Sequence, residues 1–312
     1  MSERELRQLF IQHSRDLDAR QRARIRQLRG LERDLFEAMV VRITEALDAG
    51  DGVIKSRRGS ATINELVDKA FNALDRAGLN DFYKAAVADI FTIIGNNDRY
   101  SFALATDNTN IGDKRYKSIR QQVDRIMRGK LGIDDRGRVK PNGELGKLFK
   151  SDAIRTAVKE ALNAGMTSGK PVSKLVREIE VKVKGTRLSP GVLEKALTPL
   201  VFDTYQRFDR ASSDTYAQKL GLDTFIYAGG LIETSRPFCE KHNDKVFTVE
   251  EAEKQWPKDS ALPRTKVERE SGTLVGYNPT VDMGRWNCRH RIRYIPRTLA
   301  EQLRPDLVKV RI

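Results

Sequence analysis

The chain has 312 residues, 39% of them hydrophobic and 32% charged, so it is long enough for about two or three domains and a sizeable core but is polar in composition. No apolar run approaches the length of a membrane helix, and the first residues, Met1-Ser2-Glu3-Arg4-Glu5, lack the hydrophobic core of a secretion signal. The lack of such an apolar run predicts no membrane partner. Two cysteines cannot form a disulfide framework, so we expect synthesis in a reducing cytoplasm.

The formal net charge of +14 favours a polyanionic partner, most often nucleic acid. The excess is concentrated in two places. Five arginines fall among the ten acid-free residues from Arg20 to Arg29, and eight basic residues accompany two acids from Gly284 to Ile312. A solvated surface explains any single charge, but two concentrations favour contacts with phosphate. We predict non-specific binding to double-stranded DNA by Arg20, Arg22, Arg24, Arg26, Arg29, Arg289, Arg291 and Arg293.

A long N-terminal helix is predicted over residues 2 to about 49, within a first segment that we place at 1–52. Its apolar residues recur mainly at spacings of three and four, and Gly50-Asp51-Gly52 ends it. His13 falls in the apolar stripe and is not a candidate ligand. A helix this long needs a partner along its length: another chain, another helix or a nucleic acid. One face carries Arg22, Arg26, Arg29 and Arg33.

The middle of the chain is predicted to hold a helical domain over 53–128, a turn-rich linker or small hairpin over 129–146, and a second helical domain over 147–222. In the first domain, a helical hairpin over 62–77 and 80–94 ends at Gly95, a loop follows to 112, and a helix spans 114–128. In the second, helices span 151–163 and 171–183, and Ser189-Pro190 provides the N-cap and first-turn proline of a helix that reaches Leu220.

A change of period at Asp223 begins a small α+β module over 223–296. Strands are predicted at 224–227, 245–248 and 291–295, and a loop over 257–279. A short acidic helix is predicted over 249–256, with Thr248 or the residue beside it as its cap. A basic tail over 297–312 completes the chain. The predicted fold class is therefore mainly α with a small C-terminal α+β module.

Both cysteines and two of the three histidines lie between Phe238 and His290. Cys239 and His242 form a C-x-x-H pair, and Cys288 and His290 form a C-x-H pair. Together they would provide two thiolates and two imidazoles for one tetrahedral Zn²⁺, with no position left for water, so the site would be structural. Buried apolar cysteines or a disulfide are the alternatives. Because a small sheet with a long inserted loop has little core, we predict that the ion staples it.

Specific residues of this module also carry a family resemblance. They are the run from Tyr227 to Cys239, His242, the run from Lys245 to Thr248, Glu250, Glu251, Trp256, and Asn287-Cys288-Arg289-His290. This pattern resembles the C-terminal module of the phage Mu F-like head morphogenesis (minor head) proteins, over roughly residues 150 to 296. Its marked positions in this chain are Thr234, Arg236, Cys239, Asn287, Cys288, Arg289 and His290.

The resemblance implies a virion protein without enzymatic activity, present in few copies inside the capsid near the portal. It would act in head assembly and in genome packaging or delivery, with the portal, other capsid proteins and double-stranded DNA as partners. The alternatives are a metal-dependent nuclease or a DNA-binding protein with a Cys/His knuckle. A nuclease would need a further metal site, and Asp244, Asp259 and Asp282 show no ligand spacing.

Overall fold

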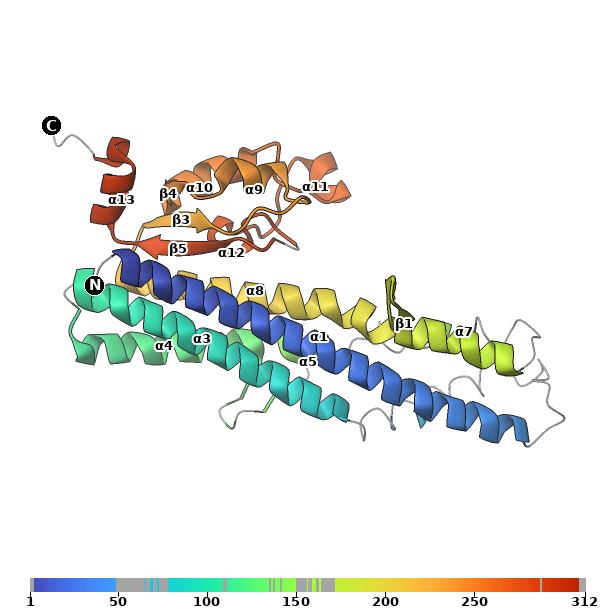
Figure 1. Cartoon of the computed structure of the whole chain (residues 1–312). Coiled ribbons are helices and arrows are strands. Elements are labelled where there is room, and N and C mark those ends of the chain that lie inside the picture. Colours follow the sequence, from blue (N-terminus) through green and yellow to red (C-terminus); the bar gives the residue numbers. More distant parts are fainter. Residues whose placement is uncertain are drawn as a thin grey trace. The chain divides into compact units, whose positions relative to one another are not determined.

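The computed structural model describes residues 3–48, 78–108, 111–134, 136, 138–140, 142–149, 172–286 and 288–308, and the single positions 65, 68, 69, 72, 156, 159, 160 and 163. The fold is mainly helical with a small C-terminal sheet, which confirms the predicted fold class (Figure 1). Two compact units interleave in sequence. Met1–Leu17, Ile90–Leu131 and Asp203–Ile312 form unit 1, and Asp18–Asp89 and Gly132–Phe202 form unit 2. The division into six consecutive segments stays a prediction.

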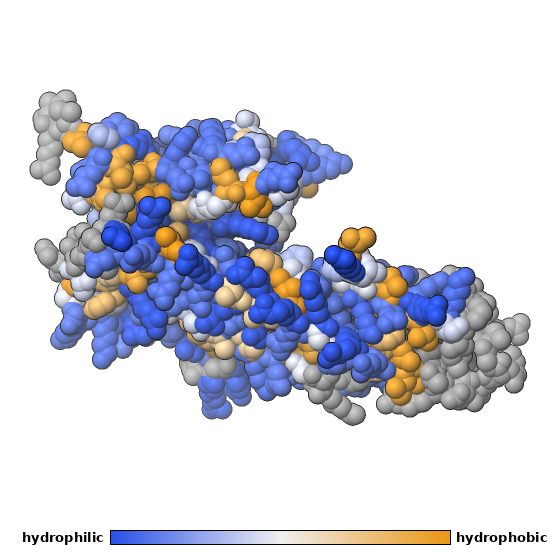
Figure 2. All heavy atoms as spheres, in the orientation of Figure 1, coloured by the Kyte–Doolittle hydropathy of each residue, from blue (hydrophilic) through white to orange (hydrophobic). Residues whose placement is uncertain are grey.

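The predicted N-terminal helix is confirmed as α1 (Glu3–Asp48), which contributes to both units. Its apolar stripe is buried at Leu17, Leu28 and Leu35, and His13 is buried in the same stripe. Among the described residues, no helix is both long and apolar enough to cross a bilayer. Hydrophilic side chains cover most of the face shown in Figure 2, with apolar side chains in separate small patches.

Helix α3 (Asn80–Asn108) continues well beyond Gly95, so the predicted loop over 96–112 is wrong for most of its length. The residues after Gly95 have tertiary partners that local sequence does not reveal. Asn97 donates from Nδ2 to Ser212 Oγ at 2.7 Å, and Leu104 and Ala105 are buried. Such contacts outweigh the weak helix propensity of Asn, Asp and Gly. The predicted helix over 62–77 lies almost wholly outside the described residues.

The next predicted helix is confirmed as α4 (Asp113–Leu131). An antiparallel bridge joins Ile133 and Val139, and α5 (Glu144–Phe149) follows. The predicted helix over 151–163 lies mostly outside the described residues. In unit 2, α7 (Val172–Lys184) confirms the helix expected at 171–183.

Ser189 and Pro190 do not begin a helix. They form β2 (Ser189–Pro190), which pairs with β1 (Gly185–Thr186), and α8 (Val192–Leu220) begins two residues later. Glu32 of α1 replaces the predicted cap, because its Oε1 accepts the backbone N–H of Glu194 at 2.7 Å. The backbone passes close to that carboxylate, since a Cβ on Gly191 would lie 2.5 Å from Glu32 Oε1.

In unit 1, an antiparallel sheet has the strand order β4-β3-β5, with β3 (Thr224–Ala228) between β4 (Val246–Thr248) and β5 (Arg291–Ile295). These strands confirm the predicted ones. Alternate residues of β3 enter different clusters, as the pleat requires. Phe225 and Tyr227 join a cluster containing Phe238, Trp256 and Tyr294, whereas Ile226 packs with Val246 and Ile295.

Short helices follow the strands of unit 1. They are α9 (Pro237–His242), α10 (Val249–Gln255), the 3₁₀ turn η3 (Trp256–Lys258), α11 (Lys266–Ser271), α12 (Pro279–Asp282), α13 (Arg297–Leu303) and η4 (Pro305–Leu307). Thr248 and Glu251 form a capping box at α10, where a cap was predicted. Thr265 and Glu268 form another at α11, which was missed within the predicted loop.

The predicted basic tail is folded as far as Leu307. Ala300 and Leu307 pack against Ile226 of the sheet. Arg304 donates to both carboxylate oxygens of Glu251, at 2.6 and 2.8 Å. The charges of this segment therefore serve tertiary contacts that sequence counting could not distinguish from an open tail. Residues 309–312 lie outside the description.

The buried carboxyl of Glu32 predicts a pH-dependent stability. Burial raises its pKa from 4.5 to about 7, against the opposing hydrogen bond from the Glu194 N–H. Because the pKa of Glu32 is higher in the folded than in the unfolded state, its protonation stabilises the fold. This contribution is fully present below about pH 4.5 and is lost as the pH rises through 7. The loss is on the order of 3 kcal/mol at most.

Glu32→Gln keeps the acceptor oxygen and removes the titration. We therefore expect thermal unfolding of the wild type to move to lower temperature between pH 5 and pH 8 relative to Glu32→Gln. Glu37→Gln, at an exposed position of the same helix, should behave as the wild type does. If the melting temperatures of the wild type and Glu32→Gln change equally between pH 5 and pH 8, Glu32 does not titrate in this range and the prediction is wrong.

Candidate metal centre

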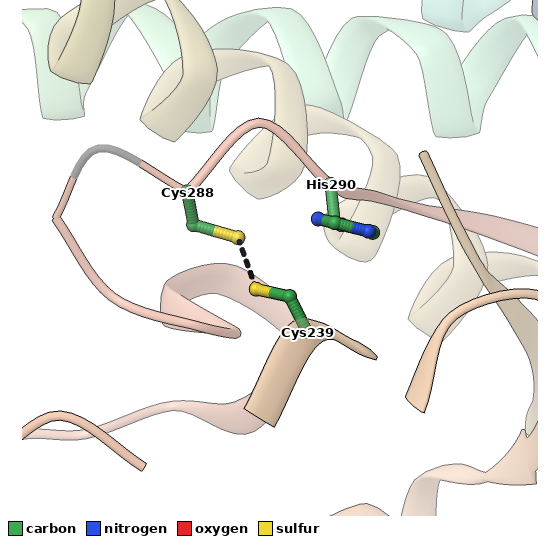
Figure 3. Close-up of side chains that lie close together, drawn as sticks. All are labelled: Cys239, Cys288 and His290. Carbon is green, nitrogen blue, oxygen red and sulfur yellow. Dashed lines mark hydrogen bonds between the residues drawn. The ribbon is translucent and has the colours of Figure 1, made fainter. Parts of the chain in front are cut away.

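Three of the four predicted ligands converge in unit 1. Cys239 lies on α9, and Cys288 and His290 lie on the segment that leads into β5 (Figure 3). The two sulfur atoms face each other at 3.8 Å, and the ligand atoms of all three residues lie within 4.8 Å of one another. All three side chains are buried. The predicted Cys/His cluster therefore exists as a compact group of two sulfurs and one imidazole that could hold a metal ion.

The sulfur–sulfur distance suits a shared ion. Two thiolates at about 2.3 Å from one tetrahedral zinc stand about 3.8 Å apart, whereas bonded sulfurs stand about 2.05 Å apart. Both cysteines are free thiols in this structure. The observed 3.8 Å thus fits the metal hypothesis and not the disulfide alternative.

His242, the predicted fourth ligand, lies outside this group. Its Nδ1 is 2.7 Å from the carbonyl oxygen of Phe238, and its Nε2 is 3.7 Å from an Asp259 carboxylate oxygen. The ring packs 4.2 Å from the Phe238 ring and 5.3 Å from the Trp256 ring. Burial lowers the pKa of His242, which favours the neutral imidazole. The C-x-x-H spacing placed His242 on the same short helix as Cys239, but the aromatic core holds its ring elsewhere.

Two residues far away in sequence hold the ligand segment. Arg210 of α8 donates from Nη2 to the carbonyl oxygens of Cys288 and His290, the latter at 2.9 Å. Asn243 Oδ1 lies 3.1 Å from His290 Nε2, which leaves Nδ1 as the nitrogen free to bind a metal. Sequence reasoning missed both residues, because the spacing of the cysteines and histidines does not indicate which other side chains contact them.

Two glycines allow the backbone to approach the ligands. A Cβ on Gly284 would lie 2.9 Å from Cys239 Sγ and 3.0 Å from Cys288 Sγ. A Cβ on Gly229 would lie 2.7 Å from the His290 ring. Arg236, a marked position of the resemblance, donates to the carbonyl of Gly284 at 2.6 Å. Positions 229 and 284 therefore both require glycine, because any side chain there would collide with a ligand.

The pKa values of the two buried thiols are shifted in opposite directions. The hydrogen bond from Cys239 holds the pKa of Cys288 well below its usual value, against the cost of burial, and His290 and Arg210 lower it further. The same hydrogen bond and burial raise the pKa of Cys239. The thiolate is the form of cysteine that binds a metal, so the lowered pKa of Cys288 favours binding there.

The arginines predicted to bind DNA are placed very differently. Arg22, Arg26, Arg29 and Arg289 are exposed. Arg20 and Arg24 are half-buried and pair with Asp89 at 2.8 and 3.0 Å. Arg291 and Arg293 are buried, so the prediction that they contact DNA is corrected: β5 carries them into the interior, where Arg291 Nε lies 3.5 Å from Asp209.

The remaining marked positions and the candidate carboxylates lie apart from the centre. Thr234 is exposed in a turn, and Asn287 lies outside the described residues. Asp259 pairs with Lys241 at 2.7 Å, and Asp282 accepts the N–H of Asn278. Within the described part of the chain, Cys239, Cys288 and His290 form the only metal-capable group of three such side chains, and no carboxylate belongs to it.

Comparison of the chain with protein-family models, with curated proteins and with solved structures gave no match.

Metal removal provides a direct test of the centre. We expect the wild type to bind one Zn²⁺ and Cys288→Ser to lose roughly a hundredfold or more in affinity, because a ligand is removed. Binding should weaken as the pH falls, since the thiols must ionise. The expectation that the α+β module has little apolar core is wrong, because Trp256, Phe225 and Phe238 are fully buried. Loss of the ion should therefore loosen 231–243 and 283–290 to proteases without melting the module.

A chelator supplies the matched control. Chelation should give the wild type the cleavage pattern of Cys288→Ser, and it should leave the variant unchanged. If chelation and Cys288→Ser give unrelated cleavage patterns, the two cysteines do not hold an ion.

Proposed function

We propose that this protein is a phage minor head protein. It acts inside the capsid near the portal, in few copies, where it aids head assembly and the packaging or delivery of the genome. The observation that carries the proposal is the convergence of Cys239, Cys288 and His290, the most specific residues of the resemblance, on one buried group. The residues that carry the resemblance thus also build the buried centre of this module.

The centre supports a structural role and not an enzymatic one. Its ligands are buried, Gly284 backbone lies against both sulfurs, and the Tyr227 hydroxyl contacts both sulfurs. Sulfur and imidazole donors in a tetrahedral arrangement are typical of Zn²⁺. A zinc without an open position holds backbone together and activates no water. We infer that Zn²⁺ fixes the ligand segment of the module and catalyses no reaction.

The exposed arginine face of α1 supports a contact with DNA. Arg22, Arg26, Arg29 and Arg33 are exposed along one face, as their spacing predicted, although Arg29 is engaged by Glu194 at 2.9 Å. A row of cations is sufficient to bind the phosphates of DNA electrostatically, without contacts to the bases. The same face favours a DNA-binding protein with a Cys/His knuckle as the second candidate. A nuclease has less support, because Asp259 and Asp282 are engaged in other contacts.

The arginine face predicts the salt dependence of DNA binding. Replacing Arg22, Arg26 and Arg33 with Gln should lower the slope of log affinity against log salt by about two to three units, because each phosphate contact contributes about 0.9. The slope should not depend on DNA sequence. The matched control replaces three exposed cations of α4 (Lys117, Arg125 and Lys130) with Gln, for the same change of charge.

The control variant should keep the wild-type slope. Equal losses in both variants would show diffuse attraction and contradict a contact on α1. Cleavage of supercoiled DNA in the presence of Mg²⁺ or Mn²⁺ would favour the nuclease instead.

The head role is tested by assembly. The full chain, coexpressed with the portal and major capsid proteins of its phage, should copurify with portal rings and enter heads in few copies. It should resist added protease until the heads are opened. Intact heads that lack the protein, together with no portal complex by native mass measurement, would refute the proposal and leave the knuckle protein as the better assignment.

A further inference from the structure

The centre has three protein ligands, whereas a closed zinc site has four. A fourth polar atom already lies beside the sulfurs. The Tyr227 hydroxyl oxygen is 3.4 Å from Cys239 Sγ and 3.5 Å from Cys288 Sγ. Tyr227 belongs to the central strand β3 and is fully buried, and its ring stacks on the His290 ring at 4.8 Å with an interplanar angle of 17°.

These distances match the edges of one tetrahedron. With metal–sulfur bonds of about 2.3 Å and a metal–oxygen bond of about 2.0 Å, sulfur–sulfur edges are about 3.8 Å and sulfur–oxygen edges about 3.5 Å. The observed edges are 3.8, 3.4 and 3.5 Å. The two sulfurs and the hydroxyl oxygen thus form a triangle of the size that one zinc ion would span, and His290 stands beside it.

We propose that the phenol oxygen of Tyr227 is the fourth metal ligand, in a site of two cysteines, one histidine and one tyrosine. When the ion binds, the oxygen–metal bond forms and the phenol proton passes to solvent, as the thiol protons do. The inference rests on the metal centre proposed above and not on the role in the phage head. It replaces His242, the fourth ligand expected from the sequence.

The rival ligand is constrained by its own contacts. His242 has Nδ1 at 2.7 Å from the Phe238 carbonyl, and its ring is enclosed by Phe238, Phe247 and Trp256. To reach the sulfurs it would have to leave this packing. Tyr227 needs no such movement, because its oxygen already contacts both sulfurs.

The test compares Tyr227→Phe with His242→Gln in the full-length protein. Reduced, metal-free protein is titrated with Zn²⁺, while the near-ultraviolet absorption of phenolate is recorded and the affinity is measured against a chromophoric chelator. The wild type and His242→Gln should gain one phenolate band per bound ion. Tyr227→Phe should gain none and should bind Zn²⁺ at least tenfold more weakly.

An unchanged affinity in Tyr227→Phe, or a wild type that binds Zn²⁺ without phenolate absorption, would overturn the assignment. Loss of affinity in His242→Gln alone would return the fourth position to His242. A wild type that binds no Zn²⁺ would remove the metal centre and the inference together, whereas the assembly experiment above can fail independently.

A second measurement keeps the test decisive if Tyr227→Phe does not fold. X-ray absorption of the zinc-loaded wild type distinguishes sulfur from nitrogen or oxygen neighbours and reports the number of imidazoles. We expect two sulfur neighbours and two lighter neighbours, one of which belongs to an imidazole. Two imidazoles would contradict the proposal.

Discussion

The guanidinium of Arg210 is the contact on which the candidate centre most depends. From α8 it binds the carbonyls of Cys288 and His290, so one rigid group fixes the backbone on both sides of the ligand segment. Arg210 is itself buried, and a buried charge is tolerated only when it is well hydrogen-bonded. Helix α8 therefore sets the separation of the two ligands before any ion arrives, and a metal would enter a framework already in place.

Buried carboxylates connect the same helix to its neighbours in unit 1. Asp98 accepts from the hydroxyls of Tyr116 and Tyr216, and Asp214 accepts from the hydroxyl of Tyr294 in β5. Asp209 contacts His13 and Asn97; although burial opposes its charge, the nearby cations and hydrogen bonds lower its pKa to about 2. Unlike apolar contacts, these bonds accept few alternative registers, so the polar network fixes how α1, α3, α8 and the sheet align.

Features that depend on local sequence could be predicted, and features that depend on remote partners could not. The apolar spacing that predicts α1 is a local feature of the sequence, and so are the patterns that predict the strands β3 and β5 and the cap at Thr248. The continuation of α3 past Gly95 depends instead on contacts more than a hundred residues away, such as that between Asn97 and Ser212. In the centre, the cysteine pairs were visible as clustering. The position of His242 and the burial of Arg291 and Arg293 were not, because spacing along a chain does not specify which way a side chain turns in a core.

The interleaving of the two units has a consequence for how the protein is made. Unit 1 contains residues from the first seventeen positions and from the last hundred or so, and Leu6 belongs to the same apolar cluster as Tyr227 and Cys288. During translation the N-terminal end of α1 must therefore wait, with part of its apolar stripe uncovered, until β3 and β5 have left the ribosome. Late closure of such a distant contact slows folding and leaves nascent chains open to association with one another. No single cut in the chain separates the two units, because each is built from segments that alternate with those of the other.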